Sequence, residues 1–198
     1  MGNTRAVPVF RTTDVHEAHA TAGRLAAIGT TPRTAMHGEV QLPTGADVER
    51  CRPLFRHGYV TDLELGPPPE GEAPRELPEG WRPEPPYAIE PHLPLTLRFE
   101  DVAPGRLDAE LLELVGSTPA ELGWWWLCWP PVPELGLAAG PKYADVQVVF
   151  NHRDIYLDGA PAADHTVFVH VGPRETDRAE WLAGQIGQRV IGPPQHGW

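Results

Sequence analysis

Nine histidines are the side chains of this sequence best suited to transfer protons or bind metal near neutral pH. His16 and His19 are three residues apart, which places both on one face of a predicted helix, close to Asp14 and Glu17. Two such ligands could hold a transition metal, but the sequence offers no identifiable third ligand. We therefore expect neither a metal nor another cofactor, and His16 and His19 are the candidates if a metal is present.

A second polar cluster, Asn151-His152-Arg153-Asp154, separates two apolar segments. In an active-site loop His152 would be a general base, Asp154 an orienting carboxylate and Arg153 an anion clamp. The same residue types are typical of a hairpin turn, which is the favoured interpretation. If the loops converge, the catalytic set to test first is His152, Asp154, Asp164 and His165.

Motifs for nucleophilic and nucleotide chemistry are absent from the sequence. The single serine, Ser117, lacks the Gly-x-Ser-x-Gly frame, and Cys128 has no adjacent base. Lys142, the only lysine, lies in Gly-Pro-Lys, outside any glycine-rich phosphate loop. These patterns argue against nucleophile-elbow hydrolysis and against nucleotide chemistry by the common loop motifs.

Four tryptophans within six residues are the least ordinary feature: Trp124, Trp125, Trp126 and Trp129. Strand alternation would direct Trp124 and Trp126 to one face, and Trp125 and Trp129 to another. Large indole rings suit a protein core, and they also dominate interface hot spots and apolar ligand pockets. The core is the favoured interpretation, but because one small domain cannot easily bury both faces, these four residues are also the candidate binding surface.

The elements that would position these side chains begin with an alternating unit in residues 1–65. Apolar periodicity, capping residues and turn residues predict the order β-α-β-α-β. Asp14 is a predicted N-cap, Asp47 could cap the second helix, and Pro53 must lie early in that helix or break it. The predicted segments are strand 6–10, helix 15–28, strand 35–42, helix 47–55 and strand 59–65.

Residues 66–90 form a Pro/Glu-rich connector, for which extended or polyproline-II chain is expected. Residues 91–198 are predicted to form an α+β domain, a mostly antiparallel sheet with two helices. Short polar joints favour antiparallel pairing. Its predicted segments are strand 93–102, helix 107–115, strands 146–150, 155–157 and 166–171, helix 177–186 and a last strand at 190–191. The fold class is therefore α+β.

Composition limits the partners and the compartment. The 198 residues carry a net charge of −11, and residues 91–198 hold 14 acidic against seven basic side chains. An acidic chain repels phosphate backbones, so nucleic acid is not an expected partner. No apolar run is long enough to cross a membrane, and two distant cysteines, Cys51 and Cys128, suit a reducing compartment. The expected location is the bacterial cytoplasm.

The segment Pro8-Val9-Phe10-Arg11-Thr12-Thr13-Asp14-Val15, followed by Glu17-Ala18, resembles the opening strand and helix of glyoxalase/vicinal-oxygen-chelate modules. The resemblance covers about a dozen residues. The aromatic pair that such modules carry later in the helix is Ala22-Gly23 here, and no matching metal ligands can be assigned. The predicted β-α-β-α-β order also differs from their βαβββ repeat, so we do not assign the chain to that family.

Three functional hypotheses follow from these observations. The favoured one is a non-enzymatic interaction protein of the immunity or inhibitor type, which holds a basic protein partner through an acidic, tryptophan-bearing surface. The alternative is a small-molecule enzyme with a His/Asp acid–base site in residues 91–198. A third is a structural subunit of a larger assembly. Enzymatic activity is left open by the sequence.

Overall fold

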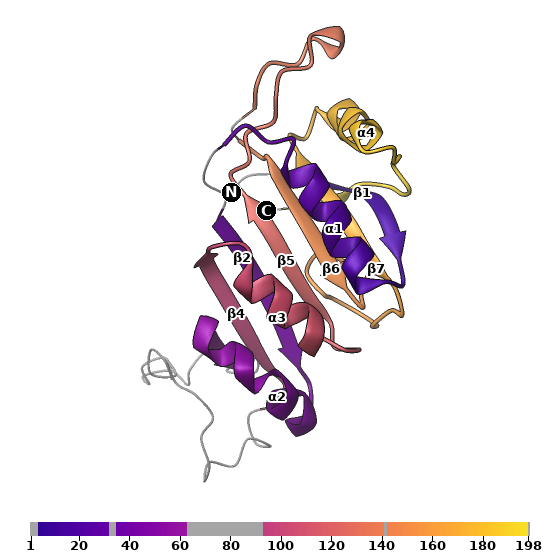
Figure 1. Ribbon diagram of the computed structural model, residues 1–198. Helices are drawn as coiled ribbons and strands as arrows, with labels where there is room; N and C mark the ends of the chain where they lie inside the picture. Colours follow the sequence, from indigo (N-terminus) through magenta and orange to yellow (C-terminus); the bar gives the residue numbers. More distant parts are fainter. Residues whose placement is uncertain (1–3, 32–34, 63–92, 141, 198) are drawn as a thin grey trace, which may run out of the picture.

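The described chain folds around one eight-stranded sheet in the order β3-β4-β2-β5-β6-β7-β1-β8 (Figure 1). The computed structural model describes residues 4–31, 35–62, 93–140 and 142–197. Every neighbouring pair of strands is antiparallel. The strands are β1 Arg5–Thr12, β2 Ala35–Leu42, β3 Tyr59–Asp62, β4 Leu95–Val102, β5 Ala120–Trp125, β6 Asp145–Phe150, β7 His165–Val171 and β8 Gln195–His196.

Strands from both ends of the sequence are interleaved in this sheet. β2 lies between β4 and β5, and β1 lies between β7 and β8. The predicted α+β class is confirmed, with its β-α-β-α-β order at the N-terminal end and an antiparallel sheet with two helices after residue 91. The predicted connector 66–90 and both predicted domain boundaries lie outside the described residues.

Local capping decides where the helices begin. The carboxylate of Asp14 accepts hydrogen bonds from the backbone N–H groups of His16 and Glu17, at 2.9 and 3.1 Å. Thr44, rather than the predicted Asp47, caps the second helix, and Asp47 completes a capping box at its third position. The described helices are α1 Val15–Ala26, α2 Gly45–Cys51, α3 Arg106–Leu114 and α4 Thr176–Gln185, with 3-10 turns η1 Arg52–His57 and η3 Pro133–Leu135.

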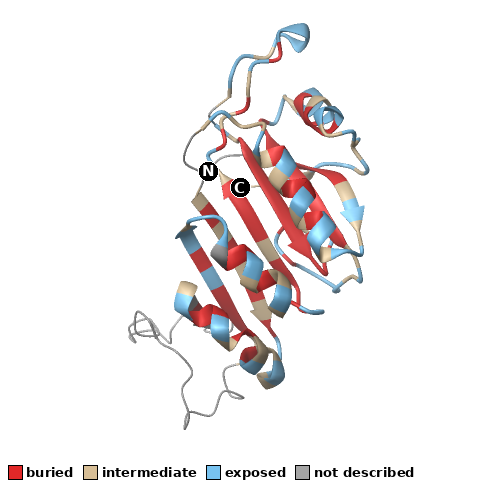
Figure 2. Cartoon of the chain, viewed as in Figure 1, coloured by how far each residue is buried: buried red, intermediate tan, exposed pale blue. Residues whose placement is uncertain are grey.

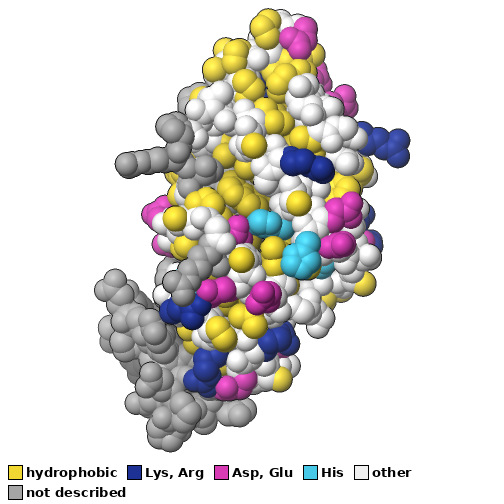
Figure 3. All heavy atoms as spheres, viewed as in Figure 1, with side chains coloured by type: hydrophobic (Ala, Val, Ile, Leu, Met, Phe, Trp, Pro, Cys, Tyr) yellow, Lys and Arg dark blue, Asp and Glu magenta, His cyan; other side chains and the backbone are white. Residues whose placement is uncertain are grey.

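The main core lies between one face of the sheet and the helices (Figures 1 and 2). Alternate residues of each strand, such as Val40 in β2, Leu122 in β5 and Val148 in β6, are fully buried there. Figure 3 views the helix-covered side of the molecule, where acidic and basic side chains are interspersed rather than grouped by sign. None of the described helices combines the length and apolarity needed to span a bilayer.

The opposite face of the sheet is covered at β6 and β7 by the segment 151–164. Ile155 and Leu157 pack there in a second small core with Ala6, Val149 and Phe168. The predicted strand 155–157 is therefore wrong, because these residues form a turn. Asp154 accepts a hydrogen bond from the Tyr156 N–H at 2.9 Å, and Leu157 adopts a positive φ of 58°.

The predicted last strand at 190–191 is also wrong. Ile191 makes one backbone bond to Pro8, from its N–H to the Pro8 carbonyl at 2.9 Å, and is 40% exposed. Pro193 and Pro194 follow, and a proline supplies no N–H to a ladder. The short last strand, β8, forms instead at Gln195–His196 against Arg5 and Ala6.

Residues 126–140 form an arm that extends beyond the end of the sheet (Figure 1). Backbone bridges join Trp129 to Gly140 and Val132 to Leu137. The buried guanidinium of Arg178 in α4 donates to the carbonyls of Pro130 and Ala138, both at 2.7 Å. These two bonds hold the two sides of the arm together at its base.

Candidate functional site

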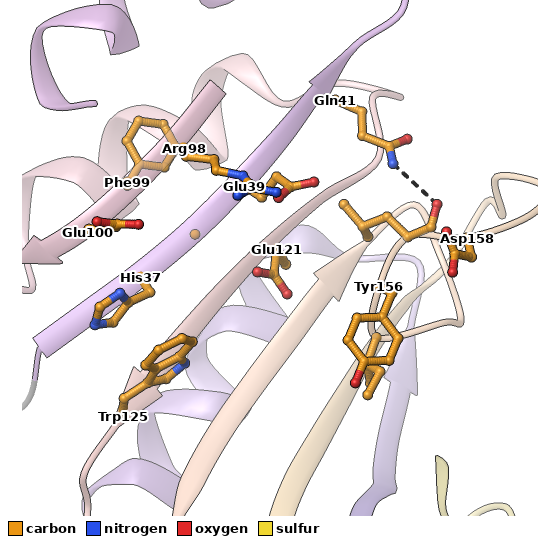
Figure 4. Close-up of a pocket in the computed structure, with 13 residues that line it drawn as sticks. His37, Glu39, Gln41, Arg98, Phe99, Glu100, Glu121, Trp125, Tyr156 and Asp158 are labelled. Carbon is orange, nitrogen blue, oxygen red and sulfur yellow. Dashed lines mark hydrogen bonds and ion pairs between the residues drawn. The ribbon is translucent and has the colours of Figure 1, made fainter. Parts of the chain in front are cut away.

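A cavity of about 420 Å³ opens on the sheet face that the helices leave uncovered (Figure 4). Its lining comes from the adjacent strands β4, β2 and β5 and from the turn at residues 155–158. The chain builds this surface because the alternating strand β2 directs Met36, Val40 and Leu42 into the main core, and His37, Glu39 and Gln41 to the opposite side. The polar half of an amphipathic strand therefore forms the floor of the cavity.

Three ionisable side chains lie in one row across that floor. In the strand register Glu39 is directly opposite Arg98 on one side and directly opposite Glu121 on the other. Arg98 Nε donates to Glu39 Oε2 at 3.1 Å. Burial raises the pKa of Glu39, although the Arg98 charge opposes that shift. Two carboxyl groups therefore share the space beside a single guanidinium.

Glu121 is the most perturbed acid of this row. Desolvation, followed by the charge of Glu39, raises the pKa of Glu121 from 4.5 to about 8. Gln147 Nε2 donates a short hydrogen bond to Glu121 Oε2, which opposes the shift without cancelling it. At pH 7 Glu121 is consequently a mostly protonated acid. The residue is partly exposed, and it lines the cavity.

A buried hydrogen-bond chain continues behind Glu121. Gln147 Nε2 also donates to the Ile155 carbonyl at 2.9 Å, and Gln147 Oε1 lies 3.0 Å from His170 Nε2. Because the amide nitrogen faces two acceptors, the amide oxygen must face His170, so His170 Nε2 carries a hydrogen. Burial lowers the pKa of His170 to about 3, which keeps the ring neutral, and Thr4 Oγ1 lies 3.4 Å from its Nδ1.

Aromatic rings form the sides of the cavity. His37 stacks on Trp125 with ring centroids 3.9 Å apart and planes inclined by 15°. Trp125 lies across Gly123, where an added Cβ would come within 2.5 Å of the indole nitrogen. Tyr156, which is 49% exposed, lines the cavity from the covering turn. Burial lowers the pKa of His37, against the charge of Asp101, and raises the pKa of Tyr156.

A β-bulge in β4 brings one more carboxylate close to this wall. The register between β2 and β4 shifts between Met36 and Gly38, and Asp101 has a positive φ of 52°. Asp101 Oδ1 consequently lies 3.4 Å from His37 Nε2. The arrangement as a whole offers a neutral acid next to a carboxylate, which is a pairing suited to general acid–base work.

The predicted tryptophan surface is divided among three environments. Trp124 and Trp129 are buried, at 6% and 1% exposure, and Trp129 Nε1 donates to the His170 carbonyl at 2.8 Å. Trp125 lines the cavity, whereas Trp126 is 63% exposed. Trp126 does not share a face with Trp124 because its backbone leaves the strand with a positive φ of 66°.

The four residues of the predicted catalytic set do not bond to one another through their side chains. His152 Nδ1 accepts a hydrogen bond from the Asp154 N–H at 3.0 Å, and His165 Nδ1 accepts one from the Asn151 N–H at 3.0 Å. Asp164 forms a two-point ion pair with Arg153, at 2.9 and 2.6 Å. Both histidines are buried, and these bonds hold the segment 151–164 in place.

The predicted metal candidates also separate. His16 is exposed, whereas half-buried His19 places Nε2 3.2 Å from Asp108 Oδ2 and packs against Trp124 with ring centroids 5.4 Å apart. Within the described ranges, no three His, Cys, Asp or Glu side chains gather in a way that could hold a metal ion. Both histidines lie on α1, on the side of the sheet away from the cavity.

Most residues of the cavity could not be identified from the sequence. Glu39 and His37 belong to a strand that was predicted, but a polar face of an amphipathic strand is ordinary for a solvated surface. Glu121 belongs to β5, which was not predicted as a strand at all. The one local signal is the single acid in Ala120-Glu121-Leu122-Gly123-Trp124-Trp125. The sequence does not identify its cross-strand partner Glu39 or its hydrogen-bond partner Gln147.

Comparison with known proteins found no relative of this chain. No protein-family model, no curated protein and no solved structure matches the chain. The function is therefore inferred from the cavity and from the row of Glu39, Arg98 and Glu121 across its floor.

Proposed function

We propose that this chain binds a small organic molecule in the cavity between β4, β2, β5 and the turn 155–158, and that Glu121 changes its protonation state when the molecule binds. The volume of about 420 Å³ lies within the range of small-molecule sites, as does the combination of aromatic walls with a few polar groups. A small-molecule ligand was one of the two partner classes expected from the sequence.

One observation carries the proposal: Glu39 and Glu121 are direct cross-strand neighbours. Like charges directly opposite each other in a sheet are destabilising. A cavity floor made for stability alone would contain one carboxylate for the one guanidinium of Arg98. An acid with a pKa raised to about 8 by burial and by a charged neighbour is typical of groups that transfer protons.

The experiment compares two adjacent tryptophans. A fragment library is screened by ligand-observed NMR against the wild type, Trp125→Ala and the matched control Trp126→Ala. We expect a set of fragments whose binding is lost in Trp125→Ala and kept in Trp126→Ala, since only Trp125 lines the cavity. Amide spectra of both variants establish that they fold. If no fragment shows this selective loss, the proposed small-molecule site is wrong.

The exposure of Trp126 supports a second candidate function, the docking of a basic protein. An indole that is 63% exposed, on a chain with a net charge of −11, suits the immunity-type or inhibitor role expected from the sequence. Here the expected difference is reversed: a stoichiometric basic partner is captured by the wild type and by Trp125→Ala but not by Trp126→Ala. Equal capture by all three proteins would contradict docking through Trp126.

The cytoplasm remains our proposed location for either function. Cys51 is a buried free thiol and Cys128 is a half-buried one. Free thiols are usual in proteins of reducing compartments. Fractionation of the native host, followed by detection of the chain with an antibody, tests the location directly.

A further inference from the structure

The residues that line the cavity include many more acidic groups than basic ones. Among the described lining residues, four carry carboxyl groups and Arg98 alone carries a permanent positive charge. That guanidinium is already bound to Glu39. His37 adds no charge at neutral pH because burial lowers its pKa. The four carboxyl residues come from three strands and the covering turn: Glu39 from β2, Glu100 from β4, Glu121 from β5 and Asp158 from the turn.

The bond from Gln147 decides which oxygen of Glu121 can carry a proton. Oε2 accepts the hydrogen bond from Gln147 Nε2, and the orientation of that amide is fixed by the Ile155 carbonyl, which can only accept. The acidic proton of Glu121 therefore resides on Oε1. A ligand that donates hydrogen bonds would face the O–H of Glu121, which is also a donor. Such a ligand binds well only when that proton leaves.

The walls of the cavity favour a flat cation. Trp125 and Tyr156 both line the cavity, and in the view of Figure 4 the carboxyl of Glu121 lies between their rings. Aromatic faces attract cations, with indole the strongest, and planar groups with two parallel N–H donors match carboxylates in a two-point geometry. A compact ammonium ion could also contact an aromatic face, but it lacks the two parallel N–H donors of the two-point geometry.

Resting on the small-molecule function proposed above, we propose that the ligand is a flat organic cation of the amidinium or protonated nitrogen-heterocycle class, and that its binding displaces the proton of Glu121. The O–H bond of Glu121 breaks, the proton passes to the buffer, and an N–H of the cation donates to the carboxylate. The cation keeps its own protons throughout.

The test uses benzamidine as the probe, with neutral benzamide and anionic benzoate as shape-matched controls. Titration calorimetry at pH 7 in two buffers of different ionisation enthalpy counts the protons released. We expect benzamidine to bind, benzamide and benzoate not to bind, and close to one proton to be released. Because the free acid titrates at about 8, affinity should increase about tenfold from pH 6 to pH 7 and level off above pH 8.

Two variants separate the role of Glu121 from the general acidity of the cavity. Glu121→Gln should bind benzamidine without proton release and with an affinity that no longer increases between pH 6 and pH 8. Glu100→Gln, which removes an exposed carboxylate at the same cavity, should weaken binding while proton release persists. Amide spectra with and without probe locate the bound benzamidine through the Trp125 indole N–H signal.

The outcomes distinguish this inference from the proposed function. If benzamide or benzoate binds as well as benzamidine, or if benzamidine fails to bind up to millimolar concentration, the cation proposal is wrong. Fragments that bind in a Trp125-dependent manner would still support the cavity as a binding site. Binding of benzamidine without proton release, or with equal release from Glu121→Gln, overturns the displacement of the Glu121 proton.

Discussion

Gln147 Oε1 accepts a hydrogen bond from His170 Nε2 at 3.0 Å, and this buried contact leaves the amide nitrogen of Gln147 facing Glu121. With its oxygen engaged, the amide turns its N–H groups to Glu121 and to the Ile155 carbonyl. The contact therefore links a fully buried histidine to the acid at the edge of the cavity.

Removing the amide donor should raise the pKa of Glu121 further. Gln147→Leu deletes the hydrogen bond that stabilises the carboxylate, so we expect Glu121 to titrate above its present value of about 8. Carboxyl carbon NMR on labelled glutamate measures the midpoint. Gln41→Leu is the control, because Gln41 lines the cavity but donates to the Leu157 carbonyl at 3.2 Å. An unchanged midpoint in Gln147→Leu would show that the amide does not stabilise the charge.

The pH dependence of stability should show Glu121 and His170 acting in opposite directions. Glu121 titrates near 4.5 when unfolded and near 8 when folded, so the folded state binds more protons in that interval and stability falls as pH rises. His170 titrates near 6.5 unfolded and near 3 folded, so stability falls as pH drops below 6.5. The two effects cancel between about 4.5 and 6.5, and the Glu121 effect acts alone above that range.

From pH 6.5 to pH 8 the wild type should therefore lose stability at a rate of up to about 1.4 kcal/mol per pH unit. Glu121→Gln should not show this loss, since its amide does not ionise. Urea unfolding at pH 5, 6.5 and 8 measures the difference. Glu113→Gln, an exposed acid on α3, is the matched control and should follow the wild type. Parallel curves for Glu121→Gln and the wild type would contradict the raised pKa.

Trp124 and Trp126 should differ sharply in their effect on folding. Trp124 is 6% exposed in the main core, so Trp124→Ala should cost about 3–5 kcal/mol of unfolding free energy. Trp126 is 63% exposed, and Trp126→Ala should stay within about 0.5 kcal/mol of the wild type. Urea unfolding followed by far-UV circular dichroism compares the two variants. A comparable loss for both would mean that the ring of Trp126 is buried in solution.

Arg178 should control the mobility of the arm. Arg178→Leu leaves the carbonyls of Pro130 and Ala138 without their charged donor, so the amides of Trp129 and Gly140 should exchange at least about tenfold faster. Hydrogen exchange followed by mass spectrometry reports this for the arm and for the sheet separately. Arg174→Leu, on the exposed segment before α4, should leave exchange in the arm unchanged. Faster exchange confined to the sheet would refute the role of Arg178.

Features that depend on neighbouring residues could be predicted from the sequence. The N-cap at Asp14 and the alternating strand 35–42 match the structure because a cap and a period of two are local properties. The turn at Ile155 was misread because its apolar residues look like a strand when the core beneath them is unknown. The pairing of Glu39 with Glu121 could not be predicted, because no local pattern tells which distant strands become neighbours or in which register. The cavity depends on that pairing. The predicted His152 and His165 lie in locally polar segments, and they accept hydrogen bonds from backbone N–H groups of the segment 151–164.

The position of β1 has a consequence for how the protein is made. Both of its neighbours, β7 and β8, come after β2 to β6 in the described chain, so β1 leaves the ribosome well before either strand with which it pairs. Until then its apolar side chains Val7 and Val9 lack the partners that enclose them in the finished molecule. A nascent chain cut short before residue 165 would keep an open sheet edge, which is the form of the protein most exposed to aggregation and to the cell's proteases.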